Sequence, residues 1–186
     1  MKPALLLVDI QLDYFPKGRM TVDGAVEASL QAKKLLAFFR EKMLPIVHIQ
    51  HIAVRPNATF LLPNTKGIEF YETVMPASGE KVIEKHYPNS FRETGLQEYL
   101  ASQQISDLVI CGMMSQMCID TTTRAAFDKG YSCTVAHDAC AARSLSFGGN
   151  AIPAAQVHGA YMAALGAVFA KVLSTEEIMA AMESAQ

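Results

Sequence analysis

Six short runs of apolar, β-prone residues recur along the chain, and each of them predicts a strand. The runs are continuous and do not alternate between apolar and polar positions, which is typical of strands that are covered on both faces. They span residues 4–10, 46–49, 81–84, 107–111, 133–136 and 167–173.

Helical spacing fills most of the intervals between these runs. Within residues 28–43 the apolar side chains fall on one face of a helix, and Pro45 stops that helix before the next strand. The apolar face consists of Ala32, Leu35, Leu36, Phe39 and Met43.

Two pairs of residues have the spacing of a capping box, in which a hydroxyl and a side chain three residues later satisfy the first N–H groups of a helix. These pairs are Thr94 with Gln97 and Ser174 with Glu177. We therefore expect helices to begin at both places.

The alternation of strands and helices predicts the fold class. It indicates right-handed βαβ units, and hence an α/β protein with a three-layer α/β/α, Rossmann-like open sheet of about six strands, mostly or wholly parallel. The length of 186 residues and the apolar content of 51% suit one domain that spans residues 1–186.

The charge balance excludes some classes of partner. Sixteen Lys and Arg residues stand against eighteen Asp and Glu residues, and these charges are dispersed, so neither nucleic acid nor an anionic membrane would be attracted.

The most apolar segment, residues 160–170, is too short to span a bilayer, and the N-terminus lacks a signal-peptide cleavage pattern. The four cysteines show no CxxC spacing. We expect a soluble cytoplasmic protein with reduced thiols.

Three chemically active side chains follow the predicted strands. Ligands of open parallel sheets bind beyond the carboxyl ends of the strands, where Asp9, Lys85 and Cys118 are expected. A carboxylate and an ammonium group at this edge can pair, and a thiol beside them has both a proton acceptor and a stabilising cation. The alternative is an Asp9–Lys85 ion pair that only closes the strand ends. The presence of the Cys118 thiol favours a catalytic site over a purely structural ion pair.

The position of Cys118 also raises two alternatives. The helical pattern "CIDTTTRAAFDKGY" begins at this cysteine without a polar cap, and a helix N-terminus stabilises a thiolate. However, an unpaired cysteine in a protein is more often a small buried apolar group.

Residues near the same strand ends are candidates for a substrate pocket. Residues 53–78 include three prolines and are predicted to form a lid or binding loop. Apolar walls are expected from Tyr14, Phe15, Phe91 and Met114, although each alone suits a core position equally well. The expected polar contacts to substrate come from Gln11, His51, Asn89 and Ser115.

Three segments carry a family resemblance. The stretches "LLLVDIQLDYF", "VIEKHYPNSF" and "VICGMMSQMCIDTTTRAAFDKGYSCTVAHDA" resemble the signature blocks of the isochorismatase-like cysteine hydrolases. This family includes nicotinamidases, N-carbamoylsarcosine amidohydrolases and ureidoacrylate amidohydrolases. The likeness spans nearly the whole chain.

The resemblance implies a role for each residue of the constellation. Cys118 matches the nucleophile, Asp9 the group that takes its proton and later passes one to the leaving amine, and Lys85 the cation beside them. It also implies a cis peptide bond between Met113 and Met114, and an oxyanion hole formed by the backbone N–H groups of Met114 and Cys118.

The chain departs from the metal-binding nicotinamidases that it otherwise resembles. Those proteins place an Asp-x-His pair after the second strand, where this chain has His51 and Ala53. His48 and His51 lie three residues apart, which sends them to opposite faces of a strand. We expect neither a metal nor another cofactor.

The resulting interpretation is a hydrolase that cleaves a C–N bond of a small carboxamide or N-carbamoyl compound. One alternative is isochorismate-type vinyl ether hydrolysis, although family members with that activity lack the cysteine. Another is a non-catalytic oligomeric binding protein with a redox-sensitive thiol. Because relatives are commonly dimers or tetramers, a homodimer or homotetramer is expected.

Overall fold

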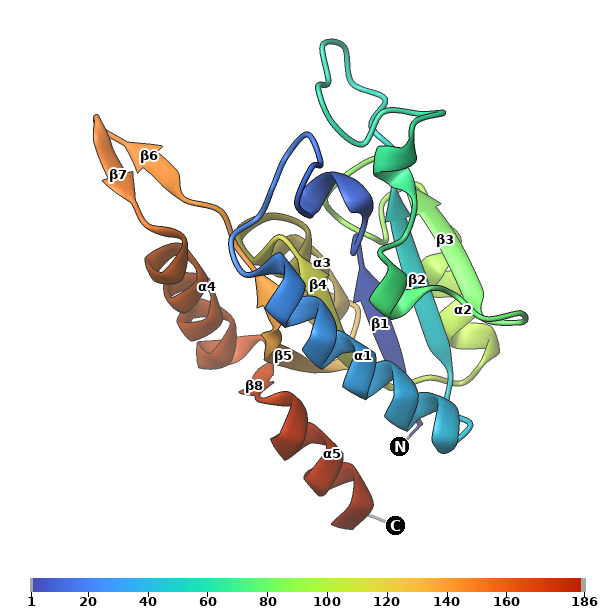
Figure 1. Cartoon of the computed structure of the whole chain (residues 1–186). Helices are drawn as coiled ribbons and strands as arrows, with labels where there is room; N and C mark the ends of the chain where they lie inside the picture. Colours follow the sequence, from blue (N-terminus) through green and yellow to red (C-terminus); the bar gives the residue numbers. More distant parts are fainter. Residues whose placement is uncertain (1, 185–186) are drawn as a thin grey trace.

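A computed structural model of the chain describes residues 2–184 and contains one six-stranded, wholly parallel sheet. The strand order is β3-β2-β1-β4-β5-β8 (Figure 1). The predicted α/β class and parallel sheet are therefore confirmed. The strands are β1 (Pro3–Val8), β2 (Ile46–His51), β3 (Lys81–Lys85), β4 (Asp107–Met113), β5 (Ser132–Ala141) and β8 (Lys171–Leu173).

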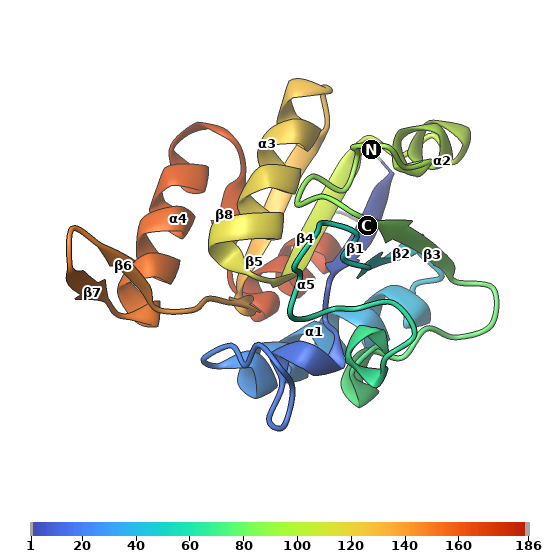
Figure 2. The same ribbon diagram turned by 90° about the horizontal axis from the view of Figure 1, so that it is seen from above.

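Helices cover both faces of the sheet, which completes three layers (Figure 2). One face carries α1 (Ala25–Glu41) and α5 (Thr175–Ser184), which contact each other. The other face carries α2 (Leu96–Ser102), α3 (Asp120–Asp128) and α4 (Ala154–Val168). Because both faces are covered, the central strand β1 is buried from Ala4 to Val8, as its continuous apolar run predicts.

Several predicted boundaries differ from the observed ones. The run 167–173 is not a single strand, because α4 continues to Val168 and β8 begins only at Lys171. A short apolar run has no periodicity that separates a buried helix end from a strand. Near Thr94 a helix does begin, α2 at Leu96, and the Leu96 N–H donates to Thr94 Oγ1 at 3.3 Å. The box itself does not form, because the Gln97 side chain accepts a hydrogen bond from Lys129 instead.

The other capping box forms as predicted. Glu177 Oε2 accepts hydrogen bonds from the Ser174 backbone N–H at 2.7 Å and from its hydroxyl at 2.8 Å. The Glu177 N–H in turn donates to Ser174 Oγ at 3.2 Å. These reciprocal bonds satisfy the first donors of α5.

A hairpin that the pattern does not predict projects beyond α4 (Figure 1). Its strands β6 (Leu145–Phe147) and β7 (Asn150–Ile152) are antiparallel and are joined by Gly148 and Gly149, both with positive φ. Phe147 is 82% exposed at its end.

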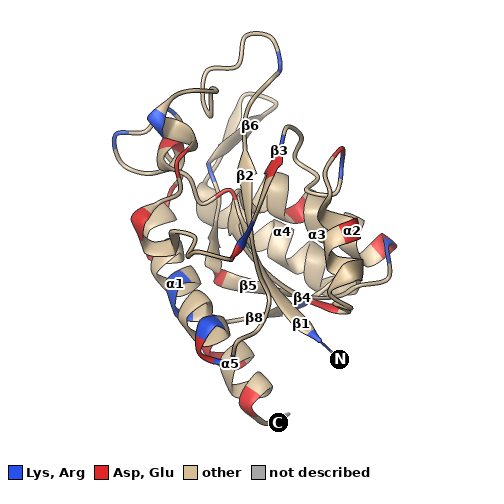
Figure 3. Cartoon of the chain, turned by 90° about the vertical axis from the view of Figure 1, so that its right-hand side faces the viewer, with Lys and Arg blue, Asp and Glu red and all other residues tan. Residues whose placement is uncertain are grey.

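The helix α4 has no charged side chain, whereas α1, α2, α3 and α5 all have at least one (Figure 3). Residues 144–170 contain no Asp, Glu, Lys or Arg. The homodimer or homotetramer remains a prediction. None of the helices among residues 2–184 combines the length and the apolar character needed to cross a bilayer.

Gly112 allows the two central strands to approach each other beside the polar cluster. It lies opposite Val8 in the register of β1 and β4, and its φ is 128°. A Cβ atom here would lie 2.0 Å from the Val8 carbonyl oxygen. Any other residue would therefore push apart the strands that carry the site.

Candidate active site

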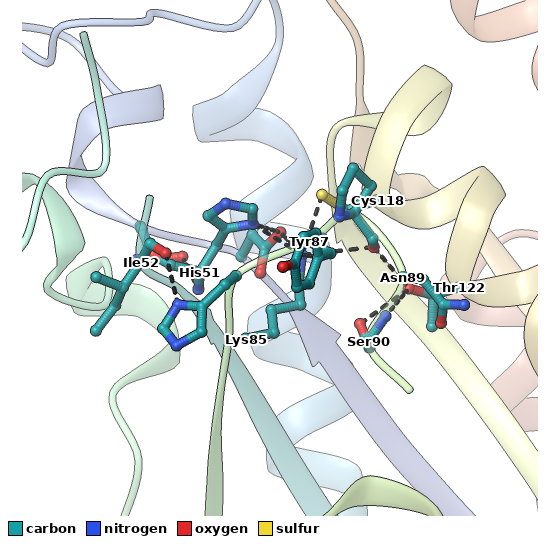
Figure 4. A network of polar contacts seen from close by, with 12 residues as sticks. His51, Ile52, Lys85, Tyr87, Asn89, Ser90, Cys118 and Thr122 are labelled. Atoms are coloured by element: carbon teal, nitrogen blue, oxygen red, sulfur yellow. Dashed lines mark hydrogen bonds and ion pairs between the residues drawn. The ribbon is translucent and has the colours of Figure 1, made fainter. Parts of the chain in front are cut away.

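The carboxyl ends of the strands bring Asp9, Lys85 and Cys118 together, as predicted. Lys85 Nζ lies 2.7 Å from Asp9 Oδ2 and 3.1 Å from Cys118 Sγ. Figure 4 shows Lys85 and Cys118 with the neighbouring His51. Asp9 and Lys85 are fully buried, and Cys118 is 4% exposed. These three residues follow or end β1, β3 and β4, so the sheet itself sets their spacing.

The helical segment that carries Cys118 begins earlier than predicted. Met114 is its N-cap, a π-helical turn spans Ser115–Ile119, and α3 follows directly. The Met114 carbonyl accepts hydrogen bonds from the N–H groups of Met117 and Ile119. The prediction that the helix starts on the cysteine is thus wrong by three residues, because the turn is of the wider π type and gives no distinct sequence signal.

Cys118 nevertheless lies within the first turn of the helical segment, where N–H groups lack intrahelical partners. The Met113–Met114 peptide bond is cis, as the resemblance implies. The assignment of the Met114 and Cys118 N–H groups to an oxyanion hole remains a prediction.

The ionisation states of the cluster follow from burial and from its own charges. Burial raises the pKa of the Cys118 thiol, and Asp9 raises it further, while Lys85 lowers it only in part. Burial alone would lower the pKa of Lys85, but Asp9 and Cys118 outweigh that effect and raise it. The resting cluster therefore holds a thiol beside an ammonium group, and not a stable thiolate.

A proton acceptor is available for this thiol. A carboxylate oxygen of Asp9 lies within 4.8 Å of Cys118 Sγ. Among residues 2–184, the buried Oδ1 of Asp9 has no hydrogen-bond partner. The arrangement can therefore deprotonate Cys118 as sulfur attacks an electrophile, because Asp9 takes the proton and Lys85 stabilises both negative groups.

His51 completes the polar cluster as a neutral side chain. Its Nδ1 lies 3.1 Å from Lys85 Nζ and accepts a hydrogen bond from that ammonium group. Burial lowers the pKa of His51 to about 4, and the nearby Lys85 charge also disfavours the imidazolium. At neutral pH the ring proton is therefore on Nε2.

The donor set of the cluster does not fit a resident metal ion. Asp9, His51 and Cys118 each offer one ligand atom, and these atoms lie within 4.8 Å of one another. However, Lys85 Nζ is within 3.1 Å of all three residues. The ammonium charge thus already occupies the position that a metal ion would need.

A cavity of about 480 Å³ opens onto Cys118. Of the residues predicted to surround the reacting group, Tyr14, His51 and Met114 line it. Part of the segment 53–78 contributes to the lining, namely residues 53–56 and 60, and the role of the segment as a lid or binding loop remains a prediction. The remaining lining comes from Ala53, Val54, Arg55, Pro56, Phe60, His86, Tyr87, Pro88 and Met117.

Sequence reasoning did not single out Arg55, Phe60, Tyr87 or Met117 as pocket residues. The prolines of the binding loop and the block around Lys85 pointed to these regions, but not to individual side chains. On an irregular loop no periodicity states which side chain faces inward.

Two of the predicted substrate contacts near β1 lie outside the cavity lining. Gln11 is fully buried, and its amide bonds the backbone N–H and C=O of His51 and the carbonyl of Ile68. Phe15 is also buried and stacks on Tyr71. Both residues hold the binding loop against the sheet, and their contact with substrate remains a prediction.

Asn89, Phe91 and Ser115 also lie outside this lining. Asn89 Oδ1 accepts a hydrogen bond from the Phe91 N–H, and the Phe91 ring stacks on Tyr131. The Ser115 hydroxyl lies 2.9 Å from Nδ1 of His158 on α4. These contacts are structural, so a direct role in substrate binding remains a prediction here too.

We expect Cys118 to react with iodoacetamide faster than the other cysteines at neutral pH. Of the four cysteines, only Cys118 lines the cavity and contacts a cation, the ammonium group of Lys85. The other three, Cys111, Cys133 and Cys140, are buried in strands. Peptide mapping after brief labelling measures the order of modification. Earlier labelling of another cysteine would remove the main support for Cys118 as the nucleophile.

Comparison with known proteins identifies what the chain is similar to. The isochorismatase domain family model matches residues 3–177. The uncharacterized isochorismatase family protein YddQ of Bacillus subtilis is 47% identical over 179 residues, which cover 96% of this chain and 99% of YddQ. A crystal structure of an isochorismatase from Pseudomonas putida KT2440 has 36% identity and a TM-score of 0.88, with 94% of this chain and 89% of that chain covered.

Several relatives are named for an activity, among them a maleamate amidohydrolase and a nicotinamidase. Maleamate amidohydrolase of Pseudomonas putida is 30% identical over 151 residues, which cover 74% of this chain and 71% of that protein.

Proposed function

Because the chain belongs to the isochorismatase family of hydrolases, we propose that it is a cysteine amidohydrolase. Its substrate is a small carboxamide or N-carbamoyl compound, and the bond that it cleaves is C–N. The observation that carries this proposal is the position of Lys85 Nζ, which contacts both the Asp9 carboxylate and the sulfur of Cys118, a residue that lines the cavity.

The first half of the reaction forms an acyl-enzyme. Cys118 Sγ attacks the carbonyl carbon while its proton moves to Asp9, and the carbonyl electrons move onto oxygen. The N–H groups of Met114 and Cys118 receive that oxyanion. When the tetrahedral adduct collapses, the C–N bond breaks and Asp9 returns the proton to the nitrogen, so that ammonia or an amine leaves.

The second half consumes water and restores the thiol. The oxygen of a water molecule attacks the thioester carbon while Asp9 takes a proton from that water. The C–S bond then breaks, and the carboxylic product departs. The proton then returns to sulfur. Lys85 remains charged throughout and offsets the negative charge as it passes between oxygen and sulfur.

Vinyl ether hydrolysis of the isochorismate type would leave the sulfur of Cys118 without a role. That reaction needs a proton delivered to carbon and an attack by water, so a nucleophilic sulfur has no step to perform. We therefore expect the protein to release ammonia or an amine from small amides and not to hydrolyse isochorismate. Turnover of isochorismate that persists in Cys118→Ala would overturn the proposal, and so would the lack of turnover across a broad amide library.

Activity is expected to survive exhaustive chelation, because the ammonium group of Lys85 supplies the positive charge of the site and a thiol nucleophile needs no metal. The measurement is the rate of ammonia release before and after dialysis against a chelator. A loss of activity that added zinc restores would contradict the assignment of the cation to Lys85.

A further inference from the structure

Arg55 brings a permanent positive charge to the wall of the cavity. Among the lining residues it is the only Arg or Lys, and its guanidinium has no ion pair or hydrogen bond within residues 2–184. The charge acts on the cavity, since it disfavours the protonated form of His51. Arg55 is exposed to solvent at the edge of the cavity, and an arginine without a partner in such a place is suited to bind a carboxylate or phosphate.

The Tyr14 hydroxyl is a second donor at the same cavity. The side chain is only 2% exposed and lines the cavity, yet no described residue forms a hydrogen bond with its hydroxyl. Burial raises the pKa of Tyr14 well above its ordinary value, followed by the effects of the nearby Cys118 and Asp9, so the hydroxyl keeps its proton. A buried phenol without a partner is available to donate to a ligand.

Asp13 anchors the base of the loop that carries Arg55 beside Tyr14. The buried Asp13 carboxylate accepts a hydrogen bond from the Leu61 N–H, and the Leu61 carbonyl accepts one from the Ala53 N–H at 2.8 Å. The loop that carries Arg55 is thus closed at its base beside the residue that precedes Tyr14. A site held in place before the ligand arrives loses less entropy when it binds.

Other groups of the cavity do not cancel this charge. Asp9 is already neutralised by Lys85 at 2.7 Å, and the Asp13 carboxylate is engaged with backbone N–H groups of Arg19 and Leu61. The remaining walls are largely apolar, with Val54, Pro56 and Phe60 on the binding loop. The cavity therefore has the Cys118 thiol at one place in its lining and the positive charge of Arg55 at another.

We propose that Arg55 and Tyr14 form an anion subsite, so that the preferred substrate is a small amide or carbamoyl compound with a carboxylate group. The reacting carbonyl sits at Cys118, and the carboxylate lies against the binding loop. This inference rests on the proposed function, because it names the class of amide that the same site accepts.

The first test does not depend on turnover. Iodoacetate and iodoacetamide alkylate thiols, and they differ in that iodoacetate carries a carboxylate. We expect the ratio of their rate constants at Cys118, iodoacetate over iodoacetamide, to fall about tenfold in Arg55→Gln and about threefold in Tyr14→Phe. Arg55→Lys should keep part of the ratio, because the charge remains while the planar fork is lost.

Arg19→Gln is the matched control. The Arg19 side chain is exposed and outside the cavity lining, so its replacement removes the same net charge, while the Arg19 backbone N–H that binds Asp13 is retained. Its ratio should equal that of the wild type within twofold. A ratio that is unchanged in Arg55→Gln, or equally reduced in Arg19→Gln, would overturn the anion subsite.

The second test uses substrates. Succinamate and butanamide have acyl chains of equal length, and only succinamate carries a carboxylate. We expect succinamate to have the higher kcat/KM, and Arg55→Gln to lower its kcat/KM about tenfold more than that of butanamide. Equal or better hydrolysis of butanamide would refute the subsite and leave the amidase intact. If neither these amides nor a broad library is hydrolysed, while the alkylation ratio responds to Arg55, the amidase proposal fails and the subsite stands.

Discussion

Replacement of Cys118 by alanine is expected to reduce amide hydrolysis by at least about 1,000-fold, because among residues 2–184 no other cysteine lines the cavity to form the thioester. The change removes one buried sulfur and should leave the fold intact. Rates of ammonia release from wild type and variant, at equal concentrations of folded protein, measure the effect.

Cys133→Ala is the matched control for this experiment. Cys133 is also buried, at 7% exposure, but it lies on β5 and does not line the cavity. It should retain hydrolysis within about twofold, since it has no part in the reaction. Substantial hydrolysis by Cys118→Ala would contradict the nucleophile assignment.

Lys85→Met is expected to reduce hydrolysis by at least about 100-fold while the fold is retained. The methionine preserves side-chain length but removes the charge that Lys85 provides to Asp9 and Cys118. The main confounder is stability, because Asp9 becomes a buried carboxylate without its cation. Such a loss costs about 3 to 5 kcal/mol of the free energy of unfolding.

The comparison must therefore be made at a temperature where circular dichroism shows both proteins folded. Lys81→Met provides the control, because Lys81 is an exposed lysine on the same strand, β3. It should retain the wild-type rate within about twofold. A wild-type rate in folded Lys85→Met would eliminate the role assigned to Lys85.

The sheet and the meeting of the polar cluster could be predicted because both depend on regular features of the sequence. Continuous apolar runs identify strands that are covered on both faces, and parallel strands place their ends at one edge. Asp9 and Lys85 each follow or end such a run, so their meeting follows from topology. The family resemblance adds Cys118, which lies beyond the end of β4.

The pocket could not be predicted to the same extent, since its walls come from irregular segments. Arg55 and Phe60 lie on a loop, and their inward position depends on hydrogen bonds between Asp13, Leu61 and Ala53. No local pattern encodes such long-range contacts. Conversely, Phe15 was predicted as a wall because it is aromatic and near a strand end, but it packs into the core.

Intact-protein mass spectrometry during turnover of a slow amide or ester tests the covalent mechanism most directly. The mechanism predicts an adduct with the mass of the acyl group, located on Cys118 by peptide mapping and absent from Cys118→Ala. The adduct should decay as the carboxylic product appears. Turnover without any adduct on rapid quenching, or an adduct that persists in Cys118→Ala, would contradict the cysteine hydrolase mechanism.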